Sequence, residues 1–243
     1  MYLGIDTSAY TSSVAVVDDS KQIIWENRRL LQVPLGEKGL AQSEALFKHI
    51  QVLPEIIAEV PLDIWQEIKG IGVSTTPRPV EGSYMPVFTA GMAIASSLAS
   101  ALRVDLVSTS HQEGHLVAGL ESTEGLDPTE FLAVHLSGGT TEILHVRNEI
   151  PGRYTIKILG ASSDLHAGQF IDRVGTRLGL SFPAGRELEK MALKASPGSA
   201  SLLPSSVKGY EMSFSGVESA VQRMIDDKKK PADLARAVEG CIV

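Results

Sequence analysis

Two stretches of the sequence, YLGIDTSAYTSSVAVV (residues 2–17) and FLAVHLSGGTTEILHV (residues 131–146), align over 16 residues without a gap. Each begins with a short apolar run, passes through small polar residues and returns as a second apolar run, the pattern of a strand, a loop and a strand. The identical pairs are Leu3/Leu132, Ser8/Ser137, Thr11/Thr140 and Val17/Val146. Two hairpins of equal length also arise by chance, but a repeat that opens each half of a chain favours two related lobes.

A repeated hairpin of this kind is typical of the actin/hsp70/sugar-kinase architecture, in which two hairpin loops hold nucleotide phosphates with backbone N–H groups. Gly138 and Gly139 suit such a loop, because glycine lets the backbone approach a phosphate and tolerates unusual dihedral angles. We therefore expect an α/β, two-lobed fold with duplicated mixed sheets flanked by helices. The polar stretch ESTEGLDPTE predicts a boundary between an N-terminal lobe, 1–122, and a C-terminal lobe, 123–243.

The bulk composition is that of a globular protein of 243 residues, with 43% hydrophobic and 21% charged residues. The net charge of −7 argues against a broad nucleic-acid-binding surface, so any such contact needs a local patch or a partner. The single cysteine, Cys241, allows no internal disulfide bond and fits a cytoplasmic protein. No signal-peptide pattern opens the chain, and serine and threonine interrupt the apolar run 85–102, so we expect no membrane segment.

Hydrophobic periodicity predicts the other elements. Helices are expected over 43–60, 166–178, 186–194 and 216–228. Three more are expected: one that ends at Leu102, one that begins after Ser110 as its N-cap, and one that begins at 231. Further strands are expected over 22–29, 68–74, 105–108 and 154–160, and a long loop over 194–209. Because the last helix reaches the final residue, we expect exposed apolar surface at Leu234, Val238 and Ile242 unless a partner covers it.

The stretch STSHQEGHLVAG places two histidines four residues apart, with a glutamate between them. On a helix, His111 and His115 share one face, where two imidazoles can bind one metal ion if another element supplies a third ligand. Glu113 points to the other side of that helix. The zinc-protease pattern has its glutamate directly after the first histidine, where this chain has Gln112, so a protease would lack its general base. Spacing alone supports a metal pair and a pair of ordinary surface histidines about equally.

Several segments, taken in order, carry a resemblance to a known family. They are YLGIDTS, STSHQEGHLVAG, LSGGTTEIL, AGQFIDRVGTRLGLSFPAGRELEKMA and EMSFSGVESAV, and the likeness extends to the end of the chain. Together they resemble the TsaD family, the transferases that make N6-threonylcarbamoyladenosine in tRNA and that were formerly described as O-sialoglycoprotein endopeptidases or glycoproteases. The ordered set is specific, although each segment alone is not. The resemblance implies the same actin/hsp70-like two-lobed fold.

The resemblance also implies site residues in both halves of the chain. His111 and His115 match the metal-binding histidines of the family's H-x-E-G-H stretch. The implied nucleotide-binding residues are Ser137, Gly138 and Gly139 in the S-G-G phosphate loop, Gly168 and Asp172 in the segment that holds the ribose, and Gly185 in the turn near the adenine.

The implied chemistry is acyl transfer. Threonylcarbamoyl-AMP, or an ATP-like adenine nucleotide in its place, is the expected ligand; the N6 amine of an adenine in the anticodon loop attacks the carbamoyl carbon, and AMP leaves. One divalent metal ion, iron or zinc, would take up charge in the transition state. No serine or cysteine has a readable paired base, so no catalytic residue is assigned. The implied partners are tRNA as substrate, other subunits of the threonylcarbamoyl-tRNA machinery, and a same-fold partner in a dimer or heterodimer.

The chain departs from the family pattern at several positions. The family's first loop, T-S-C-D-E-T, reads TSAYTS here and lacks both acids, and TPRPVEGS replaces the G-P-G loop. Thr140 stands for the histidine after S-G-G, Gln169 for the glutamate of G-E-x-F-D-K, and PAGR for the P-G-G-P turn. The family's late aspartate, which completes the metal site, has no counterpart in this sequence. Two histidines alone would bind a metal weakly, because zinc sites normally use three or more protein ligands.

These departures leave a second hypothesis open. A non-catalytic paralogue of the same fold could act as an assembly partner for the tRNA-modifying complex, and the altered first loop favours it. The retained His111, His115 and S-G-G loop favour the transferase. An ATPase or sugar kinase of this fold lacks support, because the first loop has no second acidic residue to position an attacking water or hydroxyl. A protease is the least supported function.

Overall fold

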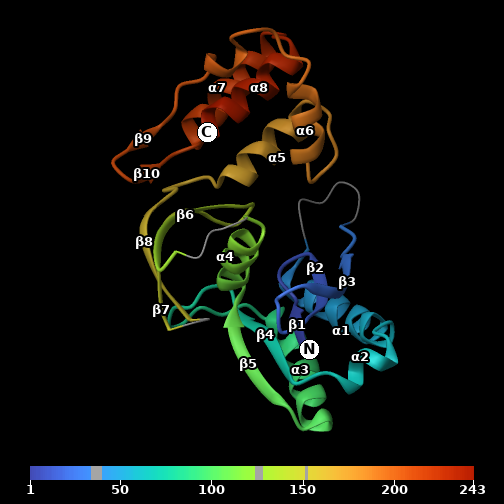
Figure 1. Cartoon of the computed structure of the whole chain (residues 1–243). Coiled ribbons are helices and arrows are strands. Elements are labelled where there is room, and N and C mark those ends of the chain that lie inside the picture. The colour runs from blue at the N-terminus through green and yellow to red at the C-terminus, as the bar shows by residue number, and fades with distance from the viewer. Residues whose placement is uncertain (34–39, 124–127, 151–152) are drawn as a thin grey trace. The chain divides into compact units, whose positions relative to one another are not determined.

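The structure is a computed structural model and describes residues 1–33, 40–123, 128–150 and 153–243. The chain divides into two compact units, Met1–Asp127 and Pro128–Val243. Figure 1 shows their elements along the chain. Each unit is described by itself.

The first unit contains a five-stranded sheet with the strand order β3-β2-β1-β4-β5. The central strand β1 (Tyr2–Asp6) pairs antiparallel with β2 (Thr11–Val17), which pairs antiparallel with β3 (Ile23–Leu30). On its other side β1 pairs in parallel with β4 (Gly70–Thr76), and β4 pairs in parallel with β5 (Asp105–Ser110). The sheet is therefore mixed, and its parallel strands end at one edge.

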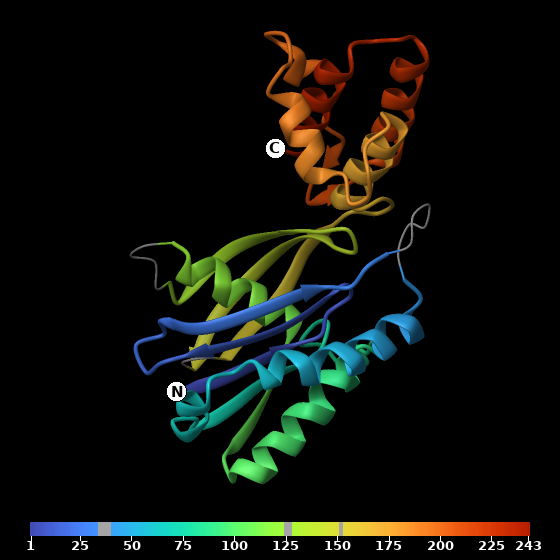
Figure 2. The same cartoon turned by 90° about the vertical axis from the view of Figure 1, so that its right-hand side faces the viewer.

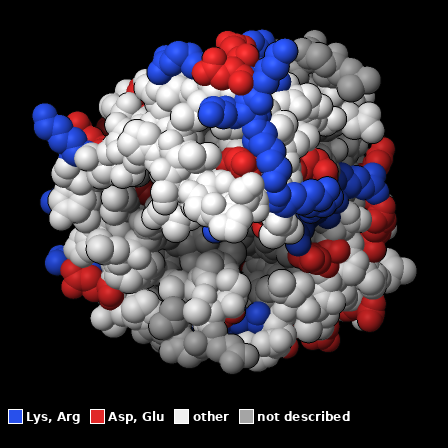
Figure 3. Space-filling view, turned by 90° about the horizontal axis from the view of Figure 1, so that it is seen from above, with Lys and Arg blue, Asp and Glu red and all other residues white. Residues whose placement is uncertain are grey.

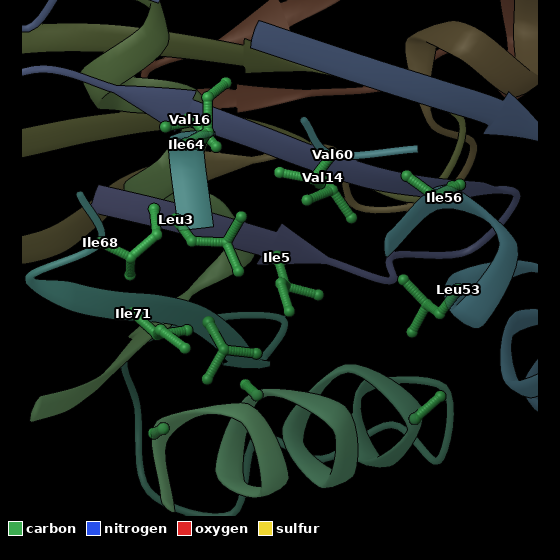
Figure 4. Close-up of a cluster of buried hydrophobic side chains, with 14 residues drawn as sticks. Leu3, Ile5, Val14, Val16, Leu53, Ile56, Val60, Ile64, Ile68 and Ile71 are labelled. Atoms are coloured by element: carbon green, nitrogen blue, oxygen red, sulfur yellow. The ribbon is translucent and has the colours of Figure 1, made fainter. Parts of the chain in front are cut away.

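Three helices of the first unit cover one face of this sheet: α1 (Gln42–Ala58), α2 (Leu62–Gln66) and α3 (Phe88–Leu102). A fourth helix, α4 (His111–Glu121), directly follows β5 and lies outside that core. Sheet residues such as Leu3, Ile5 and Val14 are buried in one core cluster with Leu53 and Ile56 of α1 (Figure 4). The small side chains of α3 allow it to lie close to the sheet, so the apolar run 85–102 belongs to the core of the first unit. Within the described ranges, none of the helices combines the length and apolar character that a membrane span requires.

The second unit begins with a three-stranded antiparallel sheet in the order β6-β7-β8. The strands are β6 (Glu130–Leu136), β7 (Thr141–Ile150) and β8 (Arg153–Ala161). A short hairpin of β9 (Val207–Lys208) and β10 (Glu211–Met212) follows later in the chain. In the described part of this unit all strand pairs within the sheets are antiparallel, whereas the first sheet is mixed.

The rest of the second unit is helical. Its helices are α5 (Ala167–Arg177), α6 (Gly185–Ala192), a 3-10 turn (Ser199–Ser201), α7 (Ser215–Asp226) and α8 (Pro231–Ile242). Figure 2 shows α5 to α8 gathered into a bundle. Phe170, Val174, Leu188 and Val221 form its core, and they come from α5, α6 and α7. The bundle therefore has an apolar core of its own.

The expectation of exposed apolar surface on the last helix is wrong. Leu234 and Val238 are fully buried, and Ile242 is partly buried against the core of the bundle. The reason is the helical period of α8, which turns these residues onto one face, and that face packs against α5, α6 and α7.

The repeat detected in the sequence is a repeat in the structure. In the first hairpin Leu3 pairs with Val16, and in the second the aligned Leu132 pairs with His145. The faces differ, however. Leu3 is 1% exposed, beneath the helices of its unit, whereas Leu132 and Val134 are 65% and 64% exposed. The two hairpins thus share register but not surroundings.

Candidate functional site

The polar residues of the first unit gather at the edge where β1, β4 and β5 end. Parallel strands bring their carboxyl ends to one edge of a sheet, which is where ligands of open α/β sheets bind. Asp6 ends β1 and Ser74 lies near the end of β4, while β5 leads directly into His111. The Asp6 carboxylate accepts hydrogen bonds from the Ser74 hydroxyl and from the backbone N–H of Ser8 at 3.1 Å.

The two histidines of α4 lie together at this edge. Their Nε2 atoms are 2.8 Å apart, and the ring planes meet at 72°. Nδ1 of His111 is 3.0 Å from Oδ1 of Asp6. A carboxylate on one ring nitrogen fixes the orientation of the ring and leaves the other nitrogen for a metal, as in carboxylate–histidine–metal triads. The two Nε2 atoms are hydrogen-bonded to each other, so the pair could hold a metal ion only after the proton between them is displaced.

The electrostatics of the site agree with that arrangement. Burial opposes ionisation of Asp6, but its contacts with His111, Ser74 and Ser8 outweigh burial and lower its pKa to about 2. Asp6 is therefore a carboxylate at neutral pH. Partial desolvation, together with the neighbouring His111, lowers the pKa of His115. That shift favours the neutral imidazole, the form that binds a metal. Over the described ranges, no group of three or more His, Cys, Asp or Glu side chains could hold a metal ion by itself.

The N-terminus of α4 is fixed by a capping box, as the sequence predicts for Ser110. The Ser110 hydroxyl accepts from the backbone N–H of Glu113, and the Glu113 carboxylate accepts from the Ser110 N–H at 2.8 Å. Glu113 also accepts from the hydroxyl of Thr109 at 3.1 Å. The carboxylate of Glu113 thus serves the helix end. Gln112 is buried, and its N–H donates to the carbonyl of Pro77 at 3.0 Å, which ties α4 to the loop after β4.

The loop that follows β1 is held by α3. Thr7 is buried, its hydroxyl donates to the carbonyl of Val87 at 3.0 Å, and it accepts from the N–H of Gly91 at 3.3 Å. A Cβ atom at Gly91 would lie 2.9 Å from the Thr7 hydroxyl oxygen, so glycine permits this close approach. The start of the first loop is therefore anchored to the N-terminal part of α3.

The second unit brings Ser137, Gly138, Gly139 and Gly168 together. The loop is closed by a hydrogen bond from the Ser137 N–H to the Thr140 carbonyl at 2.7 Å, and Gly139 N–H donates to the Ser137 hydroxyl at 3.2 Å. Gly168 donates its N–H to the Ser137 carbonyl at 3.0 Å, and a Cβ atom there would lie 2.6 Å from the Gly138 nitrogen. The glycine loop thus lies against the N-terminal end of α5, a combination that favours an anion.

Asp172 and Gly185 lie at one turn of the second unit. Oδ1 of Asp172 accepts from the backbone N–H of Ala184 at 2.7 Å. Gly185, the next residue, begins α6. Burial raises the pKa of Asp172, and the Ala184 hydrogen bond opposes that rise. Gly175 lets α5 approach this turn, because a Cβ atom there would lie 2.3 Å from the Cβ of Ala184.

Each set of predicted residues therefore lies within one unit: the histidine pair in the first, the six nucleotide-side residues in the second. Sequence reasoning missed Asp6, Thr7 and Gly175. A signal for Asp6 was available, because an acidic residue at the carboxyl end of a buried strand is a common ligand-site position. Thr7 and Gly175 carry no such signal in the sequence. Thr7 contacts Gly91 and Gly175 contacts Ala184, and these contacts form only when the chain folds.

Comparisons with known proteins show the family of the chain. The family model for tRNA N6-adenosine threonylcarbamoyltransferase (TsaD) matches residues 37–243. A probable bifunctional tRNA threonylcarbamoyladenosine biosynthesis protein of Methanothermobacter thermautotrophicus is 32% identical over 238 residues, which are 98% of this chain and 42% of that protein. A tRNA N6-adenosine threonylcarbamoyltransferase of Thermus thermophilus is 32% identical over 241 residues, 98% of this chain and 71% of that protein. The chain thus spans less than half of the first relative.

Among solved structures, HypF of T. kodakarensis superposes with a TM-score of 0.52 at 14% identity, over 99% of this chain and 38% of that one. That likeness concerns the fold alone. With the mixed sheet of the first unit, it confirms the expected actin/hsp70/sugar-kinase-like α/β fold. The expectation that both sheets are mixed is wrong, because the sheet of the second unit is antiparallel. By the match to its family model and the identity to its relatives, the chain belongs to the TsaD family of tRNA N6-adenosine threonylcarbamoyltransferases.

Proposed function

We propose that the chain transfers a threonylcarbamoyl group from threonylcarbamoyl-AMP to N6 of an adenosine in the anticodon loop of tRNA. The observation that carries the proposal is the imidazole pair of α4, with His111 oriented by the ionised Asp6 at the strand-end edge of a chain of this family. The chain spans 42% of one of these relatives and 71% of another.

His111 and His115 would hold one divalent metal ion, iron or zinc, which when bound supplies a Lewis acid for the charge that develops on the reacting oxygens. Asp6 keeps His111 in place, and the capping box of Ser110 fixes the first turn of the helix that carries both rings. The low pKa of Asp6 keeps that support intact across the physiological pH range.

The second unit would bind the adenine nucleotide, threonylcarbamoyl-AMP. The glycine loop of Ser137, Gly138 and Gly139, backed by the N-terminal end of α5, suits its phosphate. Gly168 lets that helix lie against the loop. Asp172 suits the ribose, and Gly185 suits the adenine because no side chain projects from it. Positioning and electrostatics would then drive transfer, in line with the lack of a paired nucleophile and base in the sequence.

A protease is not supported. The side chain of Glu113 caps α4, and Gln112 in the position of the protease glutamate is buried. The alternative of a non-catalytic assembly partner is not favoured either, because the matched family and the Thermus thermophilus relative are transferases by name.

The binding of tRNA would need help from a partner or a local patch. The net charge is −7. On the face seen in Figure 3, acidic side chains are interspersed among the basic ones. We therefore propose that other subunits of the threonylcarbamoyl-tRNA machinery, including a same-fold partner in a dimer or heterodimer, supply part of the tRNA surface.

The test is a transfer assay with the chain, Fe²⁺ or Zn²⁺, threonylcarbamoyl-AMP and unmodified tRNA, read as N6-threonylcarbamoyladenosine by mass spectrometry of the digested tRNA. We expect His111→Ala with His115→Ala to abolish the product. His145→Ala, which removes a histidine paired with Glu130 on β6, is the matched control and should retain activity. Wild-type chain that holds AMP but makes no product, with or without a same-fold partner, would support the assembly-partner function instead.

A further inference from the structure

A buried histidine of the first unit lies beside the first hairpin loop, outside the residues assigned above. His49, on α1, is 0% exposed, and its Nδ1 atom lies 2.7 Å from the hydroxyl oxygen of Ser12 on β2. Burial lowers the pKa of His49, while the backbone of Ala9 and the charge of Asp6 oppose that shift. The ring is therefore neutral at physiological pH, and it lies close enough to the Ala9 backbone to be influenced by it.

The second ring nitrogen of His49 needs a hydrogen-bond partner. Nε2 of His49 is buried and makes no hydrogen bond of standard geometry among the described residues, although the Ala9 backbone lies near enough to the ring to raise its pKa. A buried polar atom without a partner costs about 1–3 kcal/mol, so each such atom in a native structure calls for an explanation. When the Ser12 hydroxyl donates to Nδ1, the neutral ring carries its proton on Nε2, which is then a buried donor.

The neighbouring loop is strained at one residue. Ala9 has a φ of 38°, a left-handed conformation that costs an L-residue about 1–2 kcal/mol. Its neighbours are held by backbone hydrogen bonds: the Thr11 N–H donates to the Ser8 carbonyl at 3.0 Å, and the Leu31 N–H donates to the Tyr10 carbonyl at 2.6 Å. Strain of this kind persists only where the surroundings impose it, and it concentrates at functional sites.

We propose that His49 is a positioning residue that holds the Ala9 turn through its Nε2 atom. The Ala9 backbone lies within reach of the ring, and its carbonyl is the acceptor for Nε2–H, which satisfies the buried donor and fixes the peptide that follows Ala9. This loop of the first unit aligns with the S-G-G loop of the second. The effect of His49 on catalysis therefore rests on the proposed function. The histidine acts through Ala9 and does not touch the reacting atoms.

Two conservative substitutions separate this role from simple support of the core. The side-chain amide of Gln reaches the position of Nε2, whereas that of Asn mimics Nδ1 and keeps a partner for Ser12. Hydrogen–deuterium exchange of the peptide covering Thr7–Ser12 is measured in the wild type, His49→Gln and His49→Asn, without ligand and with AMP as the probe. A peptide from β4 serves as the internal control.

We expect His49→Asn to raise amide exchange in this loop about tenfold, and His49→Gln to stay near the wild type. The inference is overturned if the loop amides of His49→Asn are as well protected from exchange as those of the wild type. It is also overturned if only His49→Gln loses protection, because the hydrogen bond between Nδ1 and Ser12 would then account for the whole effect. If either variant fails to fold, the wild type still decides: in ¹⁵N-histidine spectra the Nε2–H of His49 must be hydrogen-bonded, and a deprotonated Nε2 contradicts the inference.

Transfer kinetics add a readout that core support alone would not change. We expect His49→Asn to raise the KM for threonylcarbamoyl-AMP about tenfold while kcat stays within about twofold. A wild-type chain without any transfer activity would defeat the proposed function. The exchange and NMR results would still decide the role of His49, so the two failures are distinguishable.

Discussion

Asp6 accepts a hydrogen bond from Ser8 and contacts Nδ1 of His111, a residue 105 positions away in the chain. We expect Asp6→Asn to weaken zinc binding about 10- to 100-fold, because the ring of His111 loses the carboxylate that orients it. Competition with a chromophoric chelator measures the affinity. Asp18→Asn, which also removes a carboxylate that accepts backbone N–H groups, is the matched control. Equal affinities of the two variants would contradict this role for Asp6.

Gly168 offers a second test at the scale of one residue. A Cβ atom there would lie 2.6 Å from the Gly138 nitrogen, so Gly168→Ala must displace either the glycine loop or α5. We expect a loss of about 1–3 kcal/mol in the free energy of unfolding, measured by urea titration, together with weaker AMP binding. Gly216→Ala in α7 is the control, since a Cβ atom there meets nothing within 4 Å. An unaltered Gly168→Ala protein would show that the loop does not need this close approach.

Single residues also mark the limit of what the sequence predicts. His111 and His115 could be paired from their spacing, and Ser110 could be recognised as an N-cap, because these relations are local. The contact of His111 with Asp6 could not, since it depends on the parallel pairing of strands far apart in the chain. The same holds for Gly168 against Ser137, whose contact follows from the packing of α5 on a distant hairpin.

At the scale of elements, Asp164 joins the loop after β8 to the start of α7. Burial opposes its ionisation, but the hydroxyls of Ser215 and Ser213 and the amides of Phe214 and Leu165 outweigh burial and hold the pKa of Asp164 well below its usual range. A depressed pKa in the folded chain stabilises the fold fully above the unfolded value of about 3.9. That stability is lost as the pH falls from there toward the folded pKa.

We therefore expect Asp164→Asn to be less stable than the wild type at neutral pH, with a difference that shrinks as the pH falls below about 4. Urea titrations at neutral and acidic pH measure the two free energies of unfolding. Asp227→Asn, at an exposed carboxylate after α7, controls for the loss of one negative charge. A difference that stays constant with pH would show that Asp164 contributes through shape and not through its charge.

Element prediction succeeded where the periodicity was strong. Residues 43–60 and 166–178 read as helices, and α1 and α5 lie there within a few residues. The short helix α2 and the β9–β10 hairpin were not anticipated, because segments of this length carry too little periodicity. For α8 the helix was predicted but its burial was not, since burial depends on which neighbours meet the apolar face.

At the scale of the whole molecule, charge limits how the chain meets RNA. With a net charge of −7, the isolated chain can neutralise few phosphates. We expect its affinity for tRNA to fall less than about tenfold between about 50 and 200 mM salt, whereas a protein with 6–10 phosphate contacts loses about 10³–10⁵. Fluorescence anisotropy of labelled tRNA measures the slope. A steep slope for the chain alone would contradict the need for a partner's basic surface.

The repeat predicted the pair of hairpins and, through them, the fold class, but it could not predict their unequal surroundings. Leu132, Val134 and Leu136 are exposed on β6, an edge strand of its sheet among the described residues, although the aligned Leu3, Ile5 and Thr7 are buried. Edge strands with exposed apolar side chains tend to pair with the edge strands of other molecules, which leads to aggregation. We therefore expect the purified chain to aggregate as its concentration rises, which light scattering measures. If Val134→Lys lowers the scattering at the same concentration, the exposed face of β6 is the site of aggregation.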